Sequence, residues 1–318
     1  MAHAIEIIDG QAQMAYAGQV PWHGLGVQVQ DNISTDEMMK AAGLDWTVEK
    51  HPMYFASGMG KLSTIDKHVA LVRSNDKQVM DIVSNNWNPI QNQEAFDFFR
   101  EFVEAGDMKM DTAGSLKEGK MVWALAKVNE GFTIKTDQGE DTVKSYLLFS
   151  NPHEYGKSVN IRYVAERVVC NNTMSVALKE NANHWLRLSH HHPFDPAKAK
   201  EMMGMADLKT NRYKEAAEFL ASRKYKADEV VEYFSKVFPS LSKKEKVARA
   251  ATKAEEFMHT QPGANLGEGT FWQLFNTVTF MTDHTMGRNQ DTRLQSAWYG
   301  QNANVKTKAL ELAVEMAR

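Results

Sequence analysis

The stretch from His68 to Asn172 constrains the fold most, because strand and turn signals alternate there around one helix signal. Two apolar segments, Val69–Val72 and Val79–Val83, are separated by polar turn-forming residues, which predicts a β-hairpin. Further strands are expected within residues 108–113, 121–127, 143–150 and 159–169. The order β, β, α, β, β, β indicates an α+β fold in which an antiparallel sheet packs against an amphipathic helix.

The helix of this core is predicted by apolar periodicity. Between Gln93 and Ala105, apolar residues recur at intervals of three and four, and charged residues occupy the other positions. Pro89 disfavours helix at the residue before it, Asn92 is a suitable N-cap, and Gly106 is a suitable helix end. One face of this helix is therefore expected to belong to the core.

The regions flanking this core differ from it. Residues 1–60 have few regular periods, apart from a short helix predicted by a capping box between Ser34 and Glu37. Beyond residue 190, glycine and β-branched residues become rarer and helical periods dominate. We therefore expect an N-terminal arm over 1–60, an antiparallel α+β core over 61–190 and a helical C-terminal region over 191–318.

Composition restricts the class of protein. The 318-residue chain has 43% hydrophobic and 24% charged residues, which is typical of globular proteins. It has no apolar run of about 18 residues and no basic start followed by an apolar stretch, so no membrane span or signal peptide is expected. A lone cysteine, Cys170, cannot form an internal disulfide, which fits a reducing compartment. A cytoplasmic protein with no membrane partner is predicted.

Charge is distributed unevenly along the chain. The net charge is −3, yet the segment from Lys209 to Lys253 contains 12 Lys or Arg against 6 Asp or Glu. Because acidic residues are interleaved throughout this segment, a solvated helix face is the favoured interpretation. A basic binding patch is the alternative.

Two clusters contain residue types used in catalysis. His190–His192, with His184 close by, could ligate a metal, but adjacent side chains diverge in a regular element and no helical metal motif accompanies them. Cys170 is near Arg167, whose charge favours a thiolate, but a nucleophile also needs a base. A polar loop and a buried structural cysteine are favoured. We expect no catalytic residue, no metal and no cofactor; an enzyme using Cys170 or the histidine-rich segment is the alternative.

A third group of ionisable residues follows the helix expected over 271–278. It comprises Asp283, His284, Arg288 and Asp291, a mixture that would suit acid–base chemistry. No nucleophile accompanies these residues in the sequence. A polar network at a helix end is the favoured interpretation.

A nucleic-acid surface on the predicted sheet is the main candidate site. If its cations project from one face, they follow a phosphate backbone while aromatic rings stack on bases. The alternative is an ordinary half-buried sheet, with charged residues outward and aromatic residues inward. The candidate contacts are Lys120, Lys127, Lys144, Lys157, Arg162, Arg167, Trp123 and Tyr163.

Several segments carry a family resemblance. Residues 83–96, 112–116 with 122–123, and 167–173, together with 270–276 and 293–300 near the C-terminus, resemble the phage/plasmid-like family of uncharacterised proteins. This resemblance implies a mobile-element context. More distantly, the order of strands and helix is similar to that of single-strand annealing recombinases, in which a curved antiparallel sheet packs on helices and subunits assemble into rings or filaments.

Together these observations lead to one main expectation. The chain is expected to be a non-enzymatic, homo-oligomeric phage or plasmid protein that binds single-stranded DNA and assists recombination or replication. Annealing needs no nucleophile, metal or cofactor, in agreement with the lack of a catalytic signature. The alternative is an interaction factor that acts on host or phage proteins, for which 18 methionines offer adaptable contact surfaces.

Overall fold

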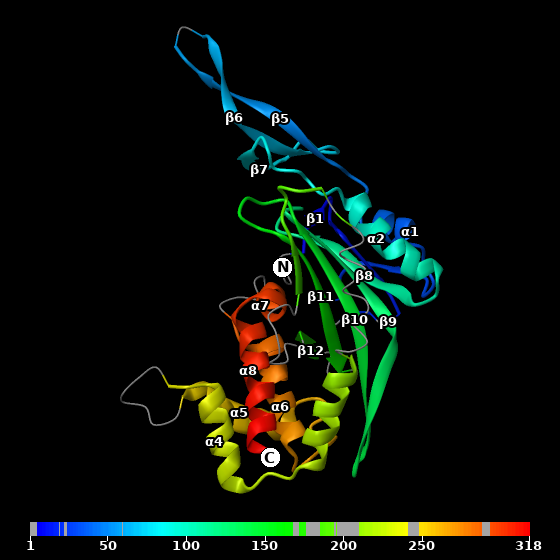
Figure 1. Ribbon diagram of the computed structural model, residues 1–318, viewed down its shortest axis with the longest axis vertical. Coiled ribbons are helices and arrows are strands. Elements are labelled where there is room, and N and C mark those ends of the chain that lie inside the picture. The colour runs from blue at the N-terminus through cyan, green and yellow to red at the C-terminus, as the bar shows by residue number, and fades with distance from the viewer. Residues whose placement is uncertain are drawn as a thin grey trace. The chain divides into compact units, whose positions relative to one another are not determined.

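The computed structural model of the protein combines sheets and helices (Figure 1). It describes residues 5–18, 20–21, 24–58, 60–167, 172–175, 185–193, 195, 210–240, 248–287 and 293–318. A largely antiparallel eight-stranded sheet is accompanied by a three-stranded sheet, a small two-stranded sheet and a helical C-terminal region. The expected α+β class is confirmed.

The strands and helices follow one another along the chain. The N-terminal part contains β1 (Ile7–Ile8), β2 (Gln11–Ala12), β3 (Met14–Ala17), β4 (Val27–Val29), α1 (Thr35–Ala41), β5 (Val48–Ala56), β6 (Leu62–Arg73), β7 (Val79–Ser84) and α2 (Asn92–Glu104). The middle contains β8 (Met108–Leu116), β9 (Met121–Thr136), β10 (Gly139–Pro152), β11 (Val159–Arg167), β12 (Asn172–Ser175) and β13 (Trp185–Leu188). The C-terminal part contains a helix over 210–222, then α4 (Ala227–Val237), α5 (Arg249–Thr260), α6 (Phe271–Phe280), the π-helix η1 (Met281–Thr285), α7 (Arg293–Tyr299) and α8 (Gln301–Met316).

The eight-stranded sheet is ordered β12-β11-β10-β9-β8-β3-β4, and β13 also pairs with β11. The β3–β4 pair is parallel, whereas β3–β8, β8–β9, β11–β12 and β11–β13 are antiparallel. The three-stranded sheet has the order β5-β6-β7. All four strands predicted after the helix are present, and three of them, β8, β9 and β10, extend beyond their predicted ends at residues 113, 127 and 150.

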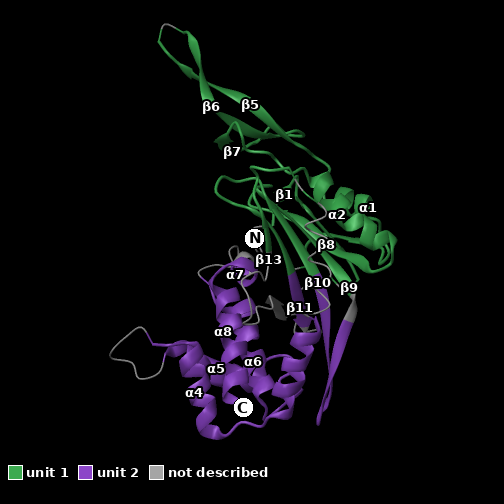
Figure 2. Cartoon of the chain, in the orientation of Figure 1, with its two compact units in different colours: residues 1–129, 147–162, 185–203 green, residues 130–146, 163–184, 204–318 purple. Residues whose placement is uncertain are grey.

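The chain forms two compact units from interleaved segments (Figure 2). The first comprises residues 1–129, 147–162 and 185–203, and the second comprises 130–146, 163–184 and 204–318. Strands β9, β10 and β11 contribute residues to both units. The units are interleaved in sequence because these long strands carry the chain from one unit into the other. The contiguous division expected from the sequence stays a prediction.

The first unit confirms the amphipathic helix, with one correction at its start. Phe96 and Phe99 of α2 are fully buried in the core of this unit. The N-cap is Gln91, not Asn92. Asn92 begins the helix and donates its side-chain amide to the carbonyls of Leu44 (2.9 Å) and Trp46 (3.3 Å). Two buried backbone acceptors are thereby satisfied.

Strand β5 was not predicted, since it lies in the segment assigned to the N-terminal arm. From Lys50 to Ala56 none of its side chains is buried. Period-two alternation arises where one face of a strand packs on a core, so a strand exposed on both faces has no such pattern. Another N-terminal feature is confirmed: α1 has the capping box between Ser34 and Glu37. The helix ends at Ala41 with Ala42 as its C-cap, and Gly43 follows with φ +67.

The second unit has its own core, formed mainly by helices. Residues Phe271 to Thr279 of α6 are all buried, and Tyr233 and Phe234 of α4 belong to the same cluster. Trp272 donates its indole N–H to the buried Asp141 carboxylate at 2.8 Å, which links α6 to β10. The predicted helical C-terminal region is confirmed. None of the helices in the described ranges is both long and apolar enough to cross a membrane.

Candidate nucleic-acid interface

The aromatic residues proposed as stacking contacts are buried. Trp123 is 3% exposed and Tyr163 is 2% exposed, and the Tyr163 hydroxyl lies 2.7 Å from Ser145 Oγ. Arg162 is also buried, at 8% exposure. These side chains pack inside the protein, as the alternative interpretation of a half-buried sheet anticipated. Their rings are not presented to bases in this conformation.

The proposed lysines are more accessible, but the structure does not bring them all together. Lys157 is exposed, and Lys120, Lys127 and Lys144 are half-buried. Lys144 belongs to the second unit, whereas the other three belong to the first. The backbone of Arg167 is described at the end of β11, but its side chain lies outside the described part.

One cationic group, Lys157 with the neighbouring Tyr155, lies in the loop after β10, close to the start of β9. The backbone N–H of His153 donates to the Lys120 carbonyl at 2.8 Å, which holds the loop after β10 beside the start of β9. This loop presents Lys157 and Tyr155, and Tyr155 is 68% exposed. An exposed ring two residues from a cation is a suitable platform for a base. Only its exposure in the structure distinguishes Tyr155 from the buried Trp123 and Tyr163.

A second cationic group consists of Lys109 and Lys127, of which only Lys127 was predicted from the sequence. The register of β8 and β9 places Lys109 directly opposite Lys127. Lys109 is exposed, Lys127 is half-buried, and neither takes part in an ion pair of the described residues. Like charges directly opposite each other on antiparallel strands repel. The pair therefore places two positive charges side by side, and a bound anion would reduce the repulsion between them. Lys109 was recognisable as an outward position between Met108 and Met110.

The basic helical segment shows one concentration of exposed charge. Arg223, Lys224 and Lys226 are exposed in the connection between the helix over 210–222 and α4. This connection is anchored by a β-bridge between Lys224 and Thr270. Residues 241–247, which contain three further lysines, lie outside the described residues. The structure therefore describes a short basic turn rather than a continuous patch.

The first of the three adjacent histidines is a core residue. His190 is 2% exposed, and its ring stacks on Trp87 with centroids 4.0 Å apart. Its Nδ1 lies 3.1 Å from the carbonyl oxygen of Asn88. Burial lowers the pKa of His190 to about 4, although the Asn88 and Pro152 carbonyls act in the opposite direction. A neutral imidazole packed on a tryptophan has a structural role.

A second buried histidine is found close to His190. His153 is fully buried, and its Nε2 lies 3.3 Å from Asn92 Oδ1. Burial lowers the pKa of His153 to about 3, and His190 contributes to this shift. His191 and His192 are exposed, and no metal-binding group of three His, Cys, Asp or Glu side chains occurs among the residues that the structure describes. Cys170 and His184 lie outside those residues.

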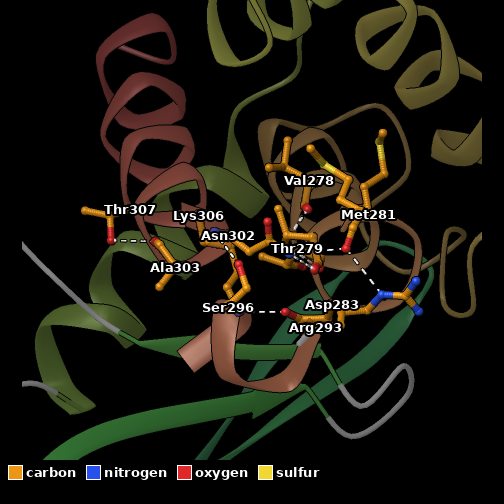
Figure 3. A network of polar contacts seen from close by, with 12 residues as sticks. Val278, Thr279, Met281, Asp283, Arg293, Ser296, Asn302, Ala303, Lys306 and Thr307 are labelled. Atoms are coloured by element: carbon orange, nitrogen blue, oxygen red, sulfur yellow. Dashed lines mark hydrogen bonds and ion pairs between the residues drawn. The ribbon is translucent and has the colours of Figure 1, made fainter. Parts of the chain in front are cut away.

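The polar residues after α6 form a buried network within the second unit (Figure 3). Lys306 Nζ lies 2.7 Å from Asp283 Oδ1, and the two side chains are 0% and 6% exposed. Asn302 donates its amide to the Thr282 carbonyl at 2.6 Å, and Arg293 donates to the His284 carbonyl at 2.7 Å. These contacts connect η1 to α7 and α8. Arg288 and Asp291, named with this group above, lie outside the described residues.

The geometry of this network favours a structural role. Single π-helical turns are frequent at functional sites, so η1 is a natural place to look for chemistry. However, Lys306 and Asp283 are closed off from solvent, which denies a substrate access to either group. The buried cation and carboxylate instead satisfy each other and hold three helical elements together.

Comparison with known proteins identifies one family. The model of a domain of unknown function, DUF932, matches residues 79–298. This range runs from β7 to α7 and contains the Lys109–Lys127 pair, whereas β5 and β6 precede it. No curated protein and no solved structure matches the chain.

Proposed function

This chain belongs to the DUF932 family, a domain of unknown function, and we propose that it binds single-stranded DNA without catalysing a reaction. The observation that carries this proposal is the Lys109–Lys127 pair, two cations that form no ion pair among the described residues and are held opposite each other on antiparallel strands. A polyanion would replace their mutual repulsion with attraction. The resemblance to phage/plasmid-like proteins supports a role in recombination or replication of a mobile element, in the cytoplasm of the host.

The two cationic groups of the first unit suit different parts of a nucleic-acid strand. Lys109 and Lys127 would neutralise phosphates, because lysine is a compact point charge without a stacking surface. Tyr155, with Lys157 beside it, would supply a ring on which an unpaired base stacks. Such contacts are independent of base sequence, as an annealing protein requires.

Binding can be tested with a fluorescently labelled single-stranded oligonucleotide, by anisotropy over a series of salt concentrations. We expect micromolar affinity that weakens as salt rises, because phosphate contacts release counterions. The double variant Lys109→Ala/Lys127→Ala should make the negative slope of log K against log salt shallower by about 1.4, since each phosphate contact on a single strand contributes about −0.7.

A matched control separates site charge from total charge. Lys40 on α1 and Lys308 on α8 are both exposed, so Lys40→Ala/Lys308→Ala removes the same charge from other elements. The control should retain the wild-type slope. Absence of salt-dependent binding by the wild-type protein contradicts the proposal, and so does an equal change of slope in the two double variants.

A further inference from the structure

The distal part of β5 and β6 is a two-stranded ribbon with no buried residue. We define the ribbon as Met53–Gly58 and Gly60–Ile65. Strand β7 pairs with β6 only between His68 and Val72, so β5 and β6 continue as a pair past the end of β7 (Figure 1). The ribbon therefore lacks a third strand.

The ribbon exposes apolar side chains on both of its faces. Tyr54 is 53% exposed, Phe55 is 51% exposed and Leu62 is 70% exposed. Tyr54 lies opposite Thr64 and Phe55 lies opposite Ser63, so the two rings project from opposite faces of the ribbon. A two-stranded hairpin is only marginally stable in water by itself, and large exposed apolar groups mark contact sites. The ribbon has the properties of a segment that is covered when the protein acts.

The same sheet carries a second exposed apolar surface. Val79 and Ile82 of β7 are 56% and 46% exposed, and β7 is an edge strand whose outer side has no partner in the sheet order. An open edge offers backbone N–H and C=O groups to another strand. Of the ten large hydrophobic side chains exposed among the described residues, five lie on β5, β6 and β7. Apolar exposure is therefore concentrated on this sheet.

We propose that a second copy of this chain covers both surfaces, with the ribbon of each copy lying along the β7 edge of the other. In a dimer with two-fold symmetry the two contacts form together, because the ribbon of each copy meets the β7 edge of the other. Charge agrees with this arrangement: Lys61 is exposed on the ribbon, and the half-buried Asp81 lies on β7 beside Ile82. The Asp81 carboxylate accepts the backbone N–H groups of Ile82 and Tyr155, which hold this negative charge in place at the edge. The aromatic ribbon and the aliphatic edge are two halves of one interface, both present on a single chain.

This proposal does not depend on nucleic-acid binding. The ribbon precedes the range that matches the family, whereas β7 begins it. Self-association uses residues different from the Lys109–Lys127 pair that carries the proposed function, so each proposal can fail while the other stands. The β7 edge does adjoin the loop that presents Tyr155, because the Tyr155 backbone N–H donates to Asp81 Oδ2 at 2.6 Å.

The test is the mass of the full chain in solution, measured by sedimentation velocity over a range of micromolar concentrations. We expect the wild-type protein to form a dimer. The ribbon variant Tyr54→Ser/Phe55→Ser and the edge variant Val79→Lys/Ile82→Lys should each weaken association at least about tenfold, because exposed aromatic and apolar groups dominate such contacts. The control Val20→Ser/Val231→Ser removes equally exposed apolar groups elsewhere and should retain the wild-type mass.

A mixing experiment tests the two-fold arrangement itself. In a mixture of ribbon and edge variants, the intact ribbon of one meets the intact edge of the other, so a mixed dimer should form more strongly than either variant dimerises alone. Circular dichroism should show an unchanged fold, since the substituted side chains are exposed.

Two results overturn the inference. One is a wild-type protein that stays monomeric throughout the concentration range. The other is a ribbon variant and an edge variant that both retain the wild-type mass. In that second case, reduced oligonucleotide affinity of the ribbon variant would identify the ribbon as a nucleic-acid contact instead. A dimer that binds no oligonucleotide would remove only the proposed function.

Discussion

The two units bury their polar groups in different ways. In the second unit, Lys306 and Asp283 form one ion pair that is almost fully enclosed. In the first, the buried Arg73 is shared among the buried Glu6, the half-exposed Asp76 and Gln78. The first unit also buries two neutral histidines, His153 and His190. Loss of one charge should therefore disturb the second unit more, whereas acid should disturb the first.

The largest expected effect is in the second unit. Lys306→Met should lower the free energy of unfolding of this unit by about 3–5 kcal/mol, because it leaves the Asp283 carboxylate buried beside an uncharged side chain. The measurement is urea unfolding combined with hydrogen exchange, which reports the two units separately.

The control is Lys253→Met on α5 of the same unit, where the lysine is exposed. It should change stability by less than about 0.5 kcal/mol. Adding Asp283→Leu to Lys306→Met should restore part of the loss, since replacing both members of a buried pair is often tolerated. If both units lose hydrogen-exchange protection together in Lys306→Met, they unfold as one cooperative unit. The two units then do not differ in their response to the loss of a buried charge.

A smaller effect is expected from the corresponding change in the first unit. Arg73→Met leaves Glu6 buried, but Ser115 Oγ still donates to Glu6 Oε2 at 2.5 Å, and Asp76 is 41% exposed. We expect a loss of about 2–3 kcal/mol, because part of the network remains satisfied. Hydrogen exchange should show the loss in β6 and β8. A loss larger than that of Lys306→Met would reverse the comparison.

The smallest expected effect per side chain is a dependence on pH confined to the first unit. Burial lowers the pKa of His153 to about 3 and of His190 to about 4, whereas both titrate near 6.5 when unfolded. Below pH 6.5 the unfolded state therefore binds more protons than the folded state. The stability contributed by the neutral imidazoles is present above pH 6.5 and is lost as pH falls towards 4. Between pH 6.5 and 5, each histidine should contribute a loss of up to about 2 kcal/mol.

The pH effect can be assigned with one variant. His153→Gln removes one titrating group while keeping a polar side chain that can contact Asn92. Its stability should fall less steeply than that of the wild-type protein between pH 6.5 and 5, as measured by urea unfolding at each pH. The exposed His191 offers a control, because His191→Gln should leave the slope unchanged. Equal slopes for all three proteins would show that the buried histidines do not govern the response to acid.

The sequence predicted those helices whose capping or apolar face depends on neighbouring residues. The Ser34–Glu37 capping box and the apolar face of α2 identified two helices, because each depends on residues within a few positions of one another. Strand β5 gave no signal, because neither of its faces is buried over most of its length. The residues of the candidate nucleic-acid interface show the same dependence on local patterns. Lys127 was found as an outward strand position, but its partner Lys109 depends on the register of β8 and β9.

By itself, the sequence determined the α+β class, the helical C-terminal region and most strand positions, since periodicity, capping and turn residues act over short distances. Only the tertiary structure decided that Trp123 and Tyr163 are buried while Tyr155 is exposed, and that Lys306 meets Asp283. It also decided that β5 and β6 continue as a ribbon beyond β7. Exposure and pairing depend on which distant segments pack together, and that long-range information is not contained in any local pattern of residues.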